Sequence, residues 1–283
     1  MGAIALPTRR DEAWKYSDLR AAFGDAPAPE AHPALADRPV IVQLAGAART
    51  YARLELATGD HAVRTERLEA AGIDASALEV IVPEGGSLTR VVLQDGTGVV
   101  LNHIRVRLAK GAVFRQFVLA TGANLARIET EVEIEGETAE VELNGIYLAA
   151  NGRHVDLTSV VHHRAGHGKT RQLIRGVARK GGRGVFQGRI LVAPNAQKTD
   201  AEQHHDALLL EEGAEINAKP ELEIHADYVS CAHGNTMGAL DDAALFYMRA
   251  RGVPGAQARA MLTQAFLREA MPAWLDGPVA DEI

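Results

Sequence analysis

The chain has 283 residues and a formal net charge of −7, which argues against a nucleic-acid-binding protein, a class that is usually basic. Hydrophobic residues make up 47% of the chain and aromatic residues 5%, so a folded protein with a mainly aliphatic core is expected. The single cysteine, Cys231, excludes an intrachain disulfide framework and is typical of a reducing compartment. No apolar run approaches the roughly 20 residues of a membrane span, and no signal peptide is recognisable, so we expect a cytoplasmic protein without a membrane partner.

The N-terminal residues are expected to form a helical arm. Trp14, Leu19 and Phe23 are roughly helically spaced among charges, which predicts an amphipathic helix over residues 9–23. Residues 24–39 contain four prolines and indicate a linker or an extended arm. The polar stretch between two apolar runs, residues 40–42 and 80–82, can hold a further helix.

From about residue 88 onward the pattern is typical of an all-β structure. Short β-branched or alternating runs recur, separated by glycine-containing turns roughly 10–16 residues apart. Few Asn-Gly or Asp-Gly turns join adjacent runs directly, so hairpins are not the main connection. These features favour a β-helix (a solenoid of stacked rungs) over a β-sandwich.

The last 43 residues are expected to be helical. Asp241 and Asp242 can cap a helix that ends at Gly252, and a second helix is expected from Pro254-Gly255 to Met271. The expected organisation is an N-terminal helical arm and linker (1–39), a β-helix core (40–240) and a C-terminal helical segment (241–283).

Cys231 and His233 are the first candidate site. In a strand, residues i and i+2 point to the same face about 6.5 Å apart, so the thiol and the imidazole would share one patch. Such a pair can be half of a soft-metal site or a thiolate stabilised by an imidazolium, but a complete metal site needs about four ligands. A buried, inert cysteine is the alternative, and a bulge near Ser230 would produce it.

An unbroken strand through this region would divide its residues between two faces. One face, expected to be the core, would carry Leu222, Ile224, Ala226 and Tyr228. The other would carry Glu221, Glu223, His225, Asp227, Val229, Cys231 and His233. On this interpretation Glu223, His225 and Asp227 are secondary candidates beside the Cys231–His233 pair.

Three other patterns indicate different functions more weakly. The segment from Gly166 to Thr170 resembles the end of a phosphate-binding loop, but it lacks the first glycine and precedes a strand-like run, so no nucleotide site is expected. A stand-alone metal-binding protein would use His162, His163 and His167. A β-helical carbohydrate-active enzyme would use an array of alternating carboxylates, namely Glu131, Glu133 and Glu135.

Residues 198–252 resemble the signature of the SufB/SufD family, which are scaffold subunits of the Suf iron–sulfur cluster assembly system. The matching residues are Thr199-Asp200-Ala201-x-Gln203, Leu208-Leu209-Leu210, Ala214-Glu215, Lys219-Pro220-Glu221-Leu222-Glu223-Ile224, Cys231-Ala232-His233-Gly234 and Leu245-Phe246-Tyr247-x-Arg249-x-Arg251-Gly252. The segment from Glu12 to Leu19, the short length and the single cysteine favour the SufD branch. The run His204-His205-Asp206-Ala207 departs from the Asn/Arg-rich residues often found before the leucines.

The resemblance implies a fold and a role. It implies a right-handed parallel β-helix core with flanking helices, in a non-catalytic scaffold. It implies a SufB-like partner across the last rungs and a SufC-like ABC-type ATPase on the C-terminal helices, and the exposed strand edges indicate a homodimer in isolation. His233 and Cys231 would contact a transient iron–sulfur cluster shared with the partner, while the isolated chain would hold none. The expected ATPase-docking residues are Leu245, Phe246, Leu262 and Phe266.

Overall fold

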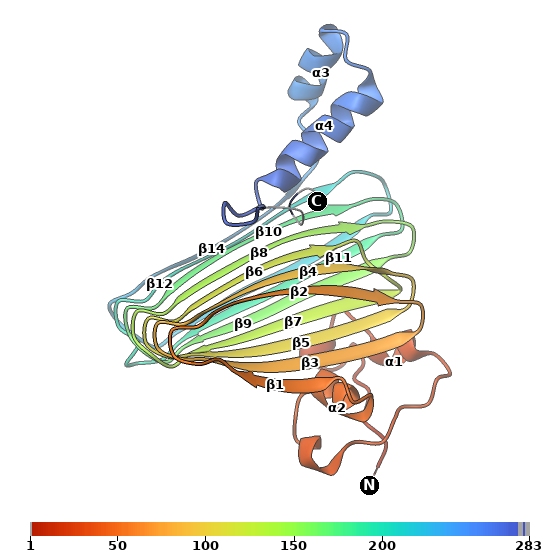
Figure 1. The fold of residues 1–283 in the computed structure, drawn as a ribbon. Coiled ribbons are helices and arrows are strands. Elements are labelled where there is room, and N and C mark those ends of the chain that lie inside the picture. Colours follow the sequence, from red (N-terminus) through yellow and green to blue (C-terminus); the bar gives the residue numbers. More distant parts are fainter. Residues whose placement is uncertain (1, 277–279, 281–283) are drawn as a thin grey trace.

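The chain folds into a parallel β-solenoid with helices at both ends, as the computed structural model shows for residues 2–276 and 280 (Figure 1). Two seven-stranded parallel sheets face each other, with strand orders β1-β3-β5-β7-β9-β11-β13 and β14-β12-β10-β8-β6-β4-β2. Successive strands therefore alternate between the sheets, and every second strand is a hydrogen-bonded neighbour. The β-helix expected from the sequence is confirmed.

Most strands are ten residues long. Their bounds are β1 (Tyr51–Glu55), β2 (His61–Ala70), β3 (Ile73–Val82), β4 (Ser87–Gly96), β5 (Val99–Leu108), β6 (Val113–Ala120), β7 (Leu125–Ile134), β8 (Glu140–Ala149), β9 (His154–His163), β10 (Lys169–Ala178), β11 (Arg183–Val192), β12 (Asp200–Leu209), β13 (Glu215–Ile224) and β14 (Ser230–Gly238). The α-helices are α1 (Leu19–Phe23), α2 (Val40–Ala47), α3 (Asp242–Ala250) and α4 (Gly255–Arg268), and two 3-10 helices are η1 (Glu12–Trp14) and η2 (Pro33–Leu35).

The core between the sheets is built from stacked aliphatic columns. One column runs through five successive strands of a single sheet and consists of Val80, Val106, Val132, Val161 and Ile190. Each of these side chains is at most 1% exposed. Burial of such a side chain contributes about 1.5–3 kcal/mol, so the columns hold the rungs together.

Glycines make the corners of the rungs possible. Gly181 has a φ of +73°, a backbone conformation that L side chains rarely adopt. At the next position, a Cβ on Gly182 would overlap the backbone of Ala149 in the rung below. The turn at Gly181-Gly182 is therefore a place where consecutive rungs approach closely.

The outer face of the β1–β13 sheet carries a charge ladder. Arg53, Glu79, Arg105 and Glu131 are direct neighbours in successive strands, so opposite charges alternate along the stack. Parallel in-register pairing places each charge beside one of opposite sign, which favours this register.

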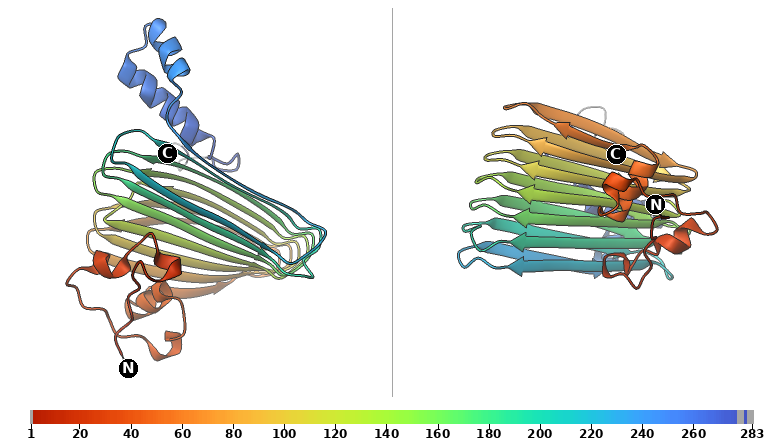
Figure 2. Two further views of the ribbon diagram at one scale, coloured as in Figure 1. Left: turned by 180° about the vertical axis from the view of Figure 1, so that it is seen from behind. Right: turned by 90° about the horizontal axis from the view of Figure 1, so that it is seen from below.

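The N-terminal arm lies against this same sheet (Figure 2). The Trp14 ring packs on the Arg127 guanidinium, with 4.0 Å from Cζ to the ring centroid, and the Ser17 hydroxyl donates to Asp156 Oδ2 at 2.5 Å. The continuous helix expected over residues 9–23 is wrong, because only η1 and α1 are helical. Trp14, Leu19 and Phe23 are nevertheless buried, since each short element turns its apolar residue toward the sheet.

The segment after the arm also differs from expectation. The apolar run at residues 40–42 is the start of helix α2, while the polar stretch that follows contains strands β1 and β2. These strands form the first, poorly covered rung, so their residues are mostly exposed and lack an apolar pattern.

The opposite sheet has an apolar outer face, and the C-terminal segment covers part of it. Leu267 and Ala270 pack against Ile146 and Val177, while α3 and α4 project away from the solenoid as a hairpin (Figure 1). Both helices expected here are present, and Asp241 caps α3 by accepting from the backbone N–H groups of Ala243 and Ala244. The end expected for the second helix at Met271 is wrong, because α4 ends at Arg268. Within residues 2–276 and 280, the structure contains no helix with the length and apolarity of a membrane span.

Candidate functional site

The candidate site lies at the last rung, where β13 and β14 end the solenoid. β13 ends at Ile224 and β14 begins at Ser230, so residues 225–229 form a corner rather than a continuous strand. The expected unbroken strand through His233 is wrong because the chain must cross from one sheet to the other. Tyr228, expected in the core, is on this corner and is 78% exposed.

Cys231 and His233 point to the inner side of the solenoid. They pair with Ala201 and Gln203 of β12, which are fully buried and face the core. The shared face expected from the i, i+2 spacing is confirmed, but it is the inner face and not the outer one. Among the residues that the structure describes, no strand lies beyond the last rung, so His233 is exposed and Cys231 is only half-buried.

The surroundings of Cys231 keep its thiol protonated. The residue packs against a cluster that includes Ile190 and Val192. Burial raises the pKa of the thiol, and the nearby Asp200 carboxylate adds to this effect, which together outweigh the hydrogen bond from the Ala201 backbone. The sequence-based hypothesis of a thiolate stabilised by an imidazolium therefore has no support, and deprotonation requires a metal or a partner's charge.

The secondary candidates are not beside this pair. Glu223 lies on the outer face of β13, where it is bonded to Arg189 and to His225 Nε2. The hydrogen bond to His225, followed by that to Arg189, lowers the pKa of Glu223. Asp227 is exposed on the corner. Within the described ranges, no group of three or more His, Cys, Asp or Glu side chains could hold a metal ion.

The three histidines that are close in sequence, His162, His163 and His167, point in different directions. His163 faces the core, where its Nε2 is 2.8 Å from Thr170 Oγ1 and burial lowers its pKa to about 4. His162 lies on the opposite face of the same strand, and His167 is on an exposed turn with a φ of +60°. They do not converge on one point, so the stand-alone metal site is not supported.

The alternating carboxylates are held by arginines. Arg105 bonds Glu133, and Arg107 Nη2 lies 2.7 Å from Glu135. Burial opposes the ionisation of Glu133, but the hydrogen bond and charge of Arg105 outweigh it and lower the pKa. A glycosidase acid needs a raised pKa, so this array is better explained as part of the charge ladder than as a catalytic pair.

A serine–histidine–aspartate cluster also lies under the N-terminal arm. Ser17 Oγ is 3.3 Å from His154 Nε2, but it donates its proton to Asp156. In a catalytic triad the carboxylate orients the histidine instead, and the serine is accessible. Ser17 is completely buried here, so the cluster anchors the arm.

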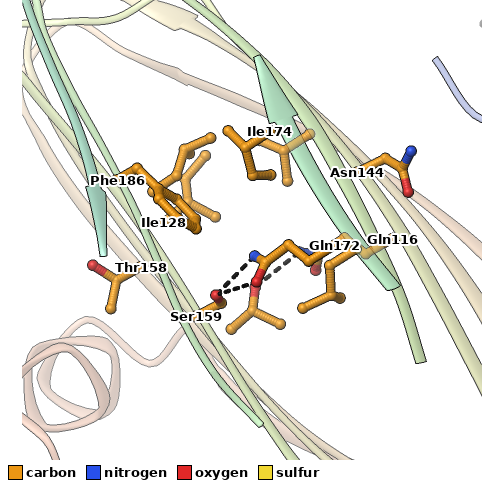
Figure 3. Close-up of a pocket in the computed structure, with 12 residues that line it drawn as sticks. Gln116, Ile128, Asn144, Thr158, Ser159, Gln172, Ile174 and Phe186 are labelled. Atoms are coloured by element: carbon orange, nitrogen blue, oxygen red, sulfur yellow. Dashed lines mark hydrogen bonds between the residues drawn. The ribbon is translucent and has the colours of Figure 1, made fainter. Parts of the chain in front are cut away.

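The interior of the solenoid contains polar residues and a small cavity (Figure 3). Gln172 Nε2 donates to Ser159 Oγ at 2.8 Å, and Gln116 Nε2 donates to Thr130 Oγ1 at 2.8 Å. The cavity between them has a volume of about 20 Å³. That is room for a water molecule, not for an organic substrate.

The C-terminal hairpin presents only part of the expected docking set. Leu245 is buried, and Phe266 faces the solenoid, where the Arg175 guanidinium packs on its ring at 4.5 Å. Leu262 is half-buried. Phe246 is 74% exposed, and Tyr247 and Met261, which the sequence interpretation did not select, are exposed as well.

Two residues of the last rung were also missed. Asn235 and Met237 continue the i, i+2 pattern of Cys231 and His233 on the inner face. The same period of two, extended toward Gly238, was the signal that could have found them.

Comparison with known proteins agrees with this architecture. Residues 41–266 match the family described as "SUF system FeS cluster assembly, SufBD core domain". The chain is 33% identical over 181 residues to the iron–sulfur cluster assembly protein SufD of Escherichia coli, covering 64% of this chain and 43% of that protein. It is 32% identical over 193 residues to a SufBD family protein of Synechocystis, covering 68% of this chain and 43% of that protein.

A third relative has the same description. A SufBD family protein of Mycobacterium leprae is 31% identical over 208 residues, covering 70% of this chain and 53% of that protein. The chain thus spans about half the length of the curated relatives that it matches. With the family match covering most of the solenoid and of α3 and α4, the chain belongs to the SufBD core family of the SUF iron–sulfur cluster assembly system.

Proposed function

We propose that this chain is a non-catalytic scaffold subunit on which an iron–sulfur cluster is assembled at an interface with a second, SufB-like chain. One observation carries the proposal: Cys231 and His233 lie together on the inner face of the last rung, where no further rung of the described chain covers them. The cluster is cargo that the two chains share transiently, and the isolated chain is expected to hold none. We expect this assembly in the cytoplasm, where the free thiol of Cys231 stays reduced.

The small number of ligands supports a shared site. A cluster is usually held by about four soft ligands, and this rung offers one sulfur and one imidazole. The other ligands would come from the partner. A site completed only in the complex, with an imidazole among its ligands, suits a scaffold that must release its cargo.

The last rung is also suited to pairing. β13 and β14 each have a free edge, and Ile224, Tyr228 and Met237 expose apolar surface around it. Exposed strand edges and apolar patches favour association. We propose that this end binds the SufB-like chain and that it pairs with a second copy when the chain is alone.

We further propose that the α3–α4 hairpin binds a SufC-like ATPase. Phe246, Tyr247 and Met261 form its exposed apolar surface. The buried Leu245 and the inward-facing Phe266 would support that surface rather than contact the partner.

The test is anaerobic cluster reconstitution with co-expressed SufB-like and SufC-like chains. Cluster content is measured by visible absorption for the wild type, His233→Ala and Cys231→Ala, with His225→Ala on the exposed corner as the matched control. We expect a large loss for His233→Ala, a smaller loss for Cys231→Ala and none for His225→Ala. Equal cluster content in all four complexes would reject the site, and failure of the wild-type chain to bind either partner would reject the scaffold role.

A further inference from the structure

A row of hydrogen-bonded side chains runs through the interior to the last rung. The Tyr147 hydroxyl on β8 is 2.9 Å from His205 Nε2 on β12. The other ring nitrogen of His205, Nδ1, is 2.7 Å from Asn235 Oδ1 on β14. Tyr147 and His205 are fully buried, whereas Asn235 is exposed beside His233. The row therefore connects the dry interior with the open end of the solenoid.

The chemistry of the row fixes the position of one proton. The amide oxygen of Asn235 can only accept, so His205 Nδ1 must carry the proton and donate it. His205 Nε2 then has a lone pair and accepts from the Tyr147 hydroxyl. Burial lowers the pKa of His205 and raises that of Tyr147, so the ring stays neutral and the hydroxyl keeps its proton.

The surrounding residues make room for this arrangement. β10 lies between β8 and β12, so the Tyr147 side chain must reach across about 10 Å of sheet. A Cβ at either Gly176 or Gly184 would overlap the Tyr147 ring, and both positions are glycine. The His205 ring stacks on Phe186, at 4.8 Å between centroids, and lies nearly parallel to the Tyr147 ring, at 5.9 Å, with its plane within 9° of both. The ring is thus fixed by packing as well as by hydrogen bonds.

Strand β14 needs such a restraint. It has a neighbouring strand on one side only, and Gly234 gives its backbone extra freedom between His233 and Asn235. Among the inward side chains of β14 that the structure describes, Asn235 accepts from a buried side chain of the rung below, whereas Cys231 packs there and accepts from the Ala201 backbone.

We propose that His205 is a positioning residue for the last rung: through Asn235 it holds β14 in place and so sets the direction in which His233 faces the partner. The effect on His233 rests on the function proposed above, whereas the restraint on β14 does not. Its functional consequence is that cluster content depends on a residue that touches neither the cluster nor the partner.

The first test determines which ring nitrogen of His205 carries the proton in the wild-type chain. Nuclear magnetic resonance of ¹⁵N-histidine-labelled protein, with His205 assigned by the signal missing in His205→Phe, should show a neutral ring protonated on Nδ1. In Tyr147→Phe the Nε2 signal should move toward the position of a nitrogen without a hydrogen bond. A ring protonated on Nε2 would overturn the proposal.

The second test measures how far the bond to Asn235 protects the backbone of β14 from hydrogen exchange. Amide hydrogen exchange of residues 230–238 should become about tenfold faster or more in Asn235→Ala. Asn235→Asp, which keeps an acceptor oxygen, should restore most of the protection. The matched control is Thr236→Ala, which removes the outward bond from Thr236 to Asp206 and should leave the His205 signals unchanged.

The outcomes distinguish a failure of this proposal from a failure of the proposed function. If Asn235→Ala exchanges no faster than the wild type, the positioning role of His205 is rejected, whatever the cluster measurements give. If exchange rises and reconstituted complexes lose cluster in both Asn235→Ala and His205→Phe, the full proposal stands. If exchange rises while His233→Ala leaves cluster content unchanged, the proposed site fails and the restraint on β14 is retained.

Discussion

Cys231 and His233 differ in how far the fold prepares them to bind a soft metal. A thiol must lose its proton first, and burial at Cys231 opposes that loss. His233 is exposed, and a neutral imidazole can bind a metal through its lone pair. This difference is the physical reason to rank His233 above Cys231 as the proposed cluster contact.

At the same scale, Arg127 is a buried charge whose removal should be costly. It is 1% exposed and donates to Asp156 Oδ2 at 2.7 Å and Glu129 Oε1 at 2.6 Å. Arg127→Met leaves two carboxylates without their partner in a buried place, so we expect a loss of about 3–5 kcal/mol in the free energy of unfolding in urea. Arg179→Met, which breaks an exposed pair with Glu211, is the control and should cost about 1 kcal/mol or less.

His163 should make stability depend on pH. Burial lowers its pKa to about 4 in the folded chain, while the unfolded chain has an ordinary histidine near 6.5. The unfolded state therefore binds the proton first, and stability is lost as pH falls from about 6.5 to about 4, by up to about 3 kcal/mol. Urea unfolding midpoints across this range should fall less steeply in His163→Gln, and a slope equal to that of the wild type would contradict the assignment. His225→Gln is the exposed control.

At the scale of elements, corners and hairpin have opposite requirements. A corner must bring two rungs together without side chains between them, whereas the hairpin, in the proposed docking role, must keep apolar side chains free for a partner. Each requirement can be tested by comparing two substitutions. The two substituted residues differ mainly in their surroundings.

Gly182→Ala should destabilise the solenoid. Its new Cβ would overlap the backbone of Ala149, which cannot move without shifting a rung, so a loss of about 1–3 kcal/mol is expected in urea unfolding. Gly72→Ala is the matched control, because a Cβ there meets no atom within 4 Å. Equal stability of the two variants would show that the corners tolerate side chains.

Phe246→Ala should separate docking from folding. The side chain is 74% exposed, so unfolding free energy should change by about 0.5 kcal/mol or less, while affinity for the SufC-like partner, measured by calorimetry, should fall about tenfold or more. Leu245→Ala, at a buried neighbour, should instead cost about 2 kcal/mol or more of stability. Unchanged partner affinity in Phe246→Ala would move the docking surface elsewhere.

At the scale of the whole molecule, the N-terminal arm ties distant rungs together. Trp14 contacts β7 through Arg127, Ser17 contacts β9, and Lys219 on β13 donates to Glu12 at 2.6 Å. Solenoid rungs otherwise contact only their neighbours, so their unfolding can become stepwise. The arm counters this tendency by linking strands that are far apart in sequence.

Loosening the N-terminal arm should reduce the cooperativity of unfolding. In the double variant Trp14→Ala/Ser17→Ala, urea unfolding followed by circular dichroism should lose slope or divide into two transitions. The change in slope, rather than the midpoint alone, is the informative quantity, because any core truncation lowers the midpoint. A single transition with wild-type slope would mean that the rungs cooperate without the arm.

The sequence predicted the solenoid and both C-terminal helices because their signals are local. Strand alternation, corner glycines and the Asp241 cap each act within a few residues. It did not predict the corner at residues 225–229, because the face of a strand in a solenoid is decided by the rung beneath it. Nor did it reveal the contacts of Tyr147 and Ser17, whose partners are 58 and 139 residues away.

The charge ladder limits how a solenoid of this kind can change length. Its signs repeat every two rungs from Arg53 to Glu131, whereas one rung is the smallest unit that can be gained or lost. Deleting residues 83–108 would set Glu79 beside Glu131 and leave two carboxylates adjacent along the stack. Removing or duplicating two rungs together keeps the signs alternating. Viable length variants of this part of the solenoid should therefore differ by an even number of rungs. The surface charges, rather than the core, impose this parity.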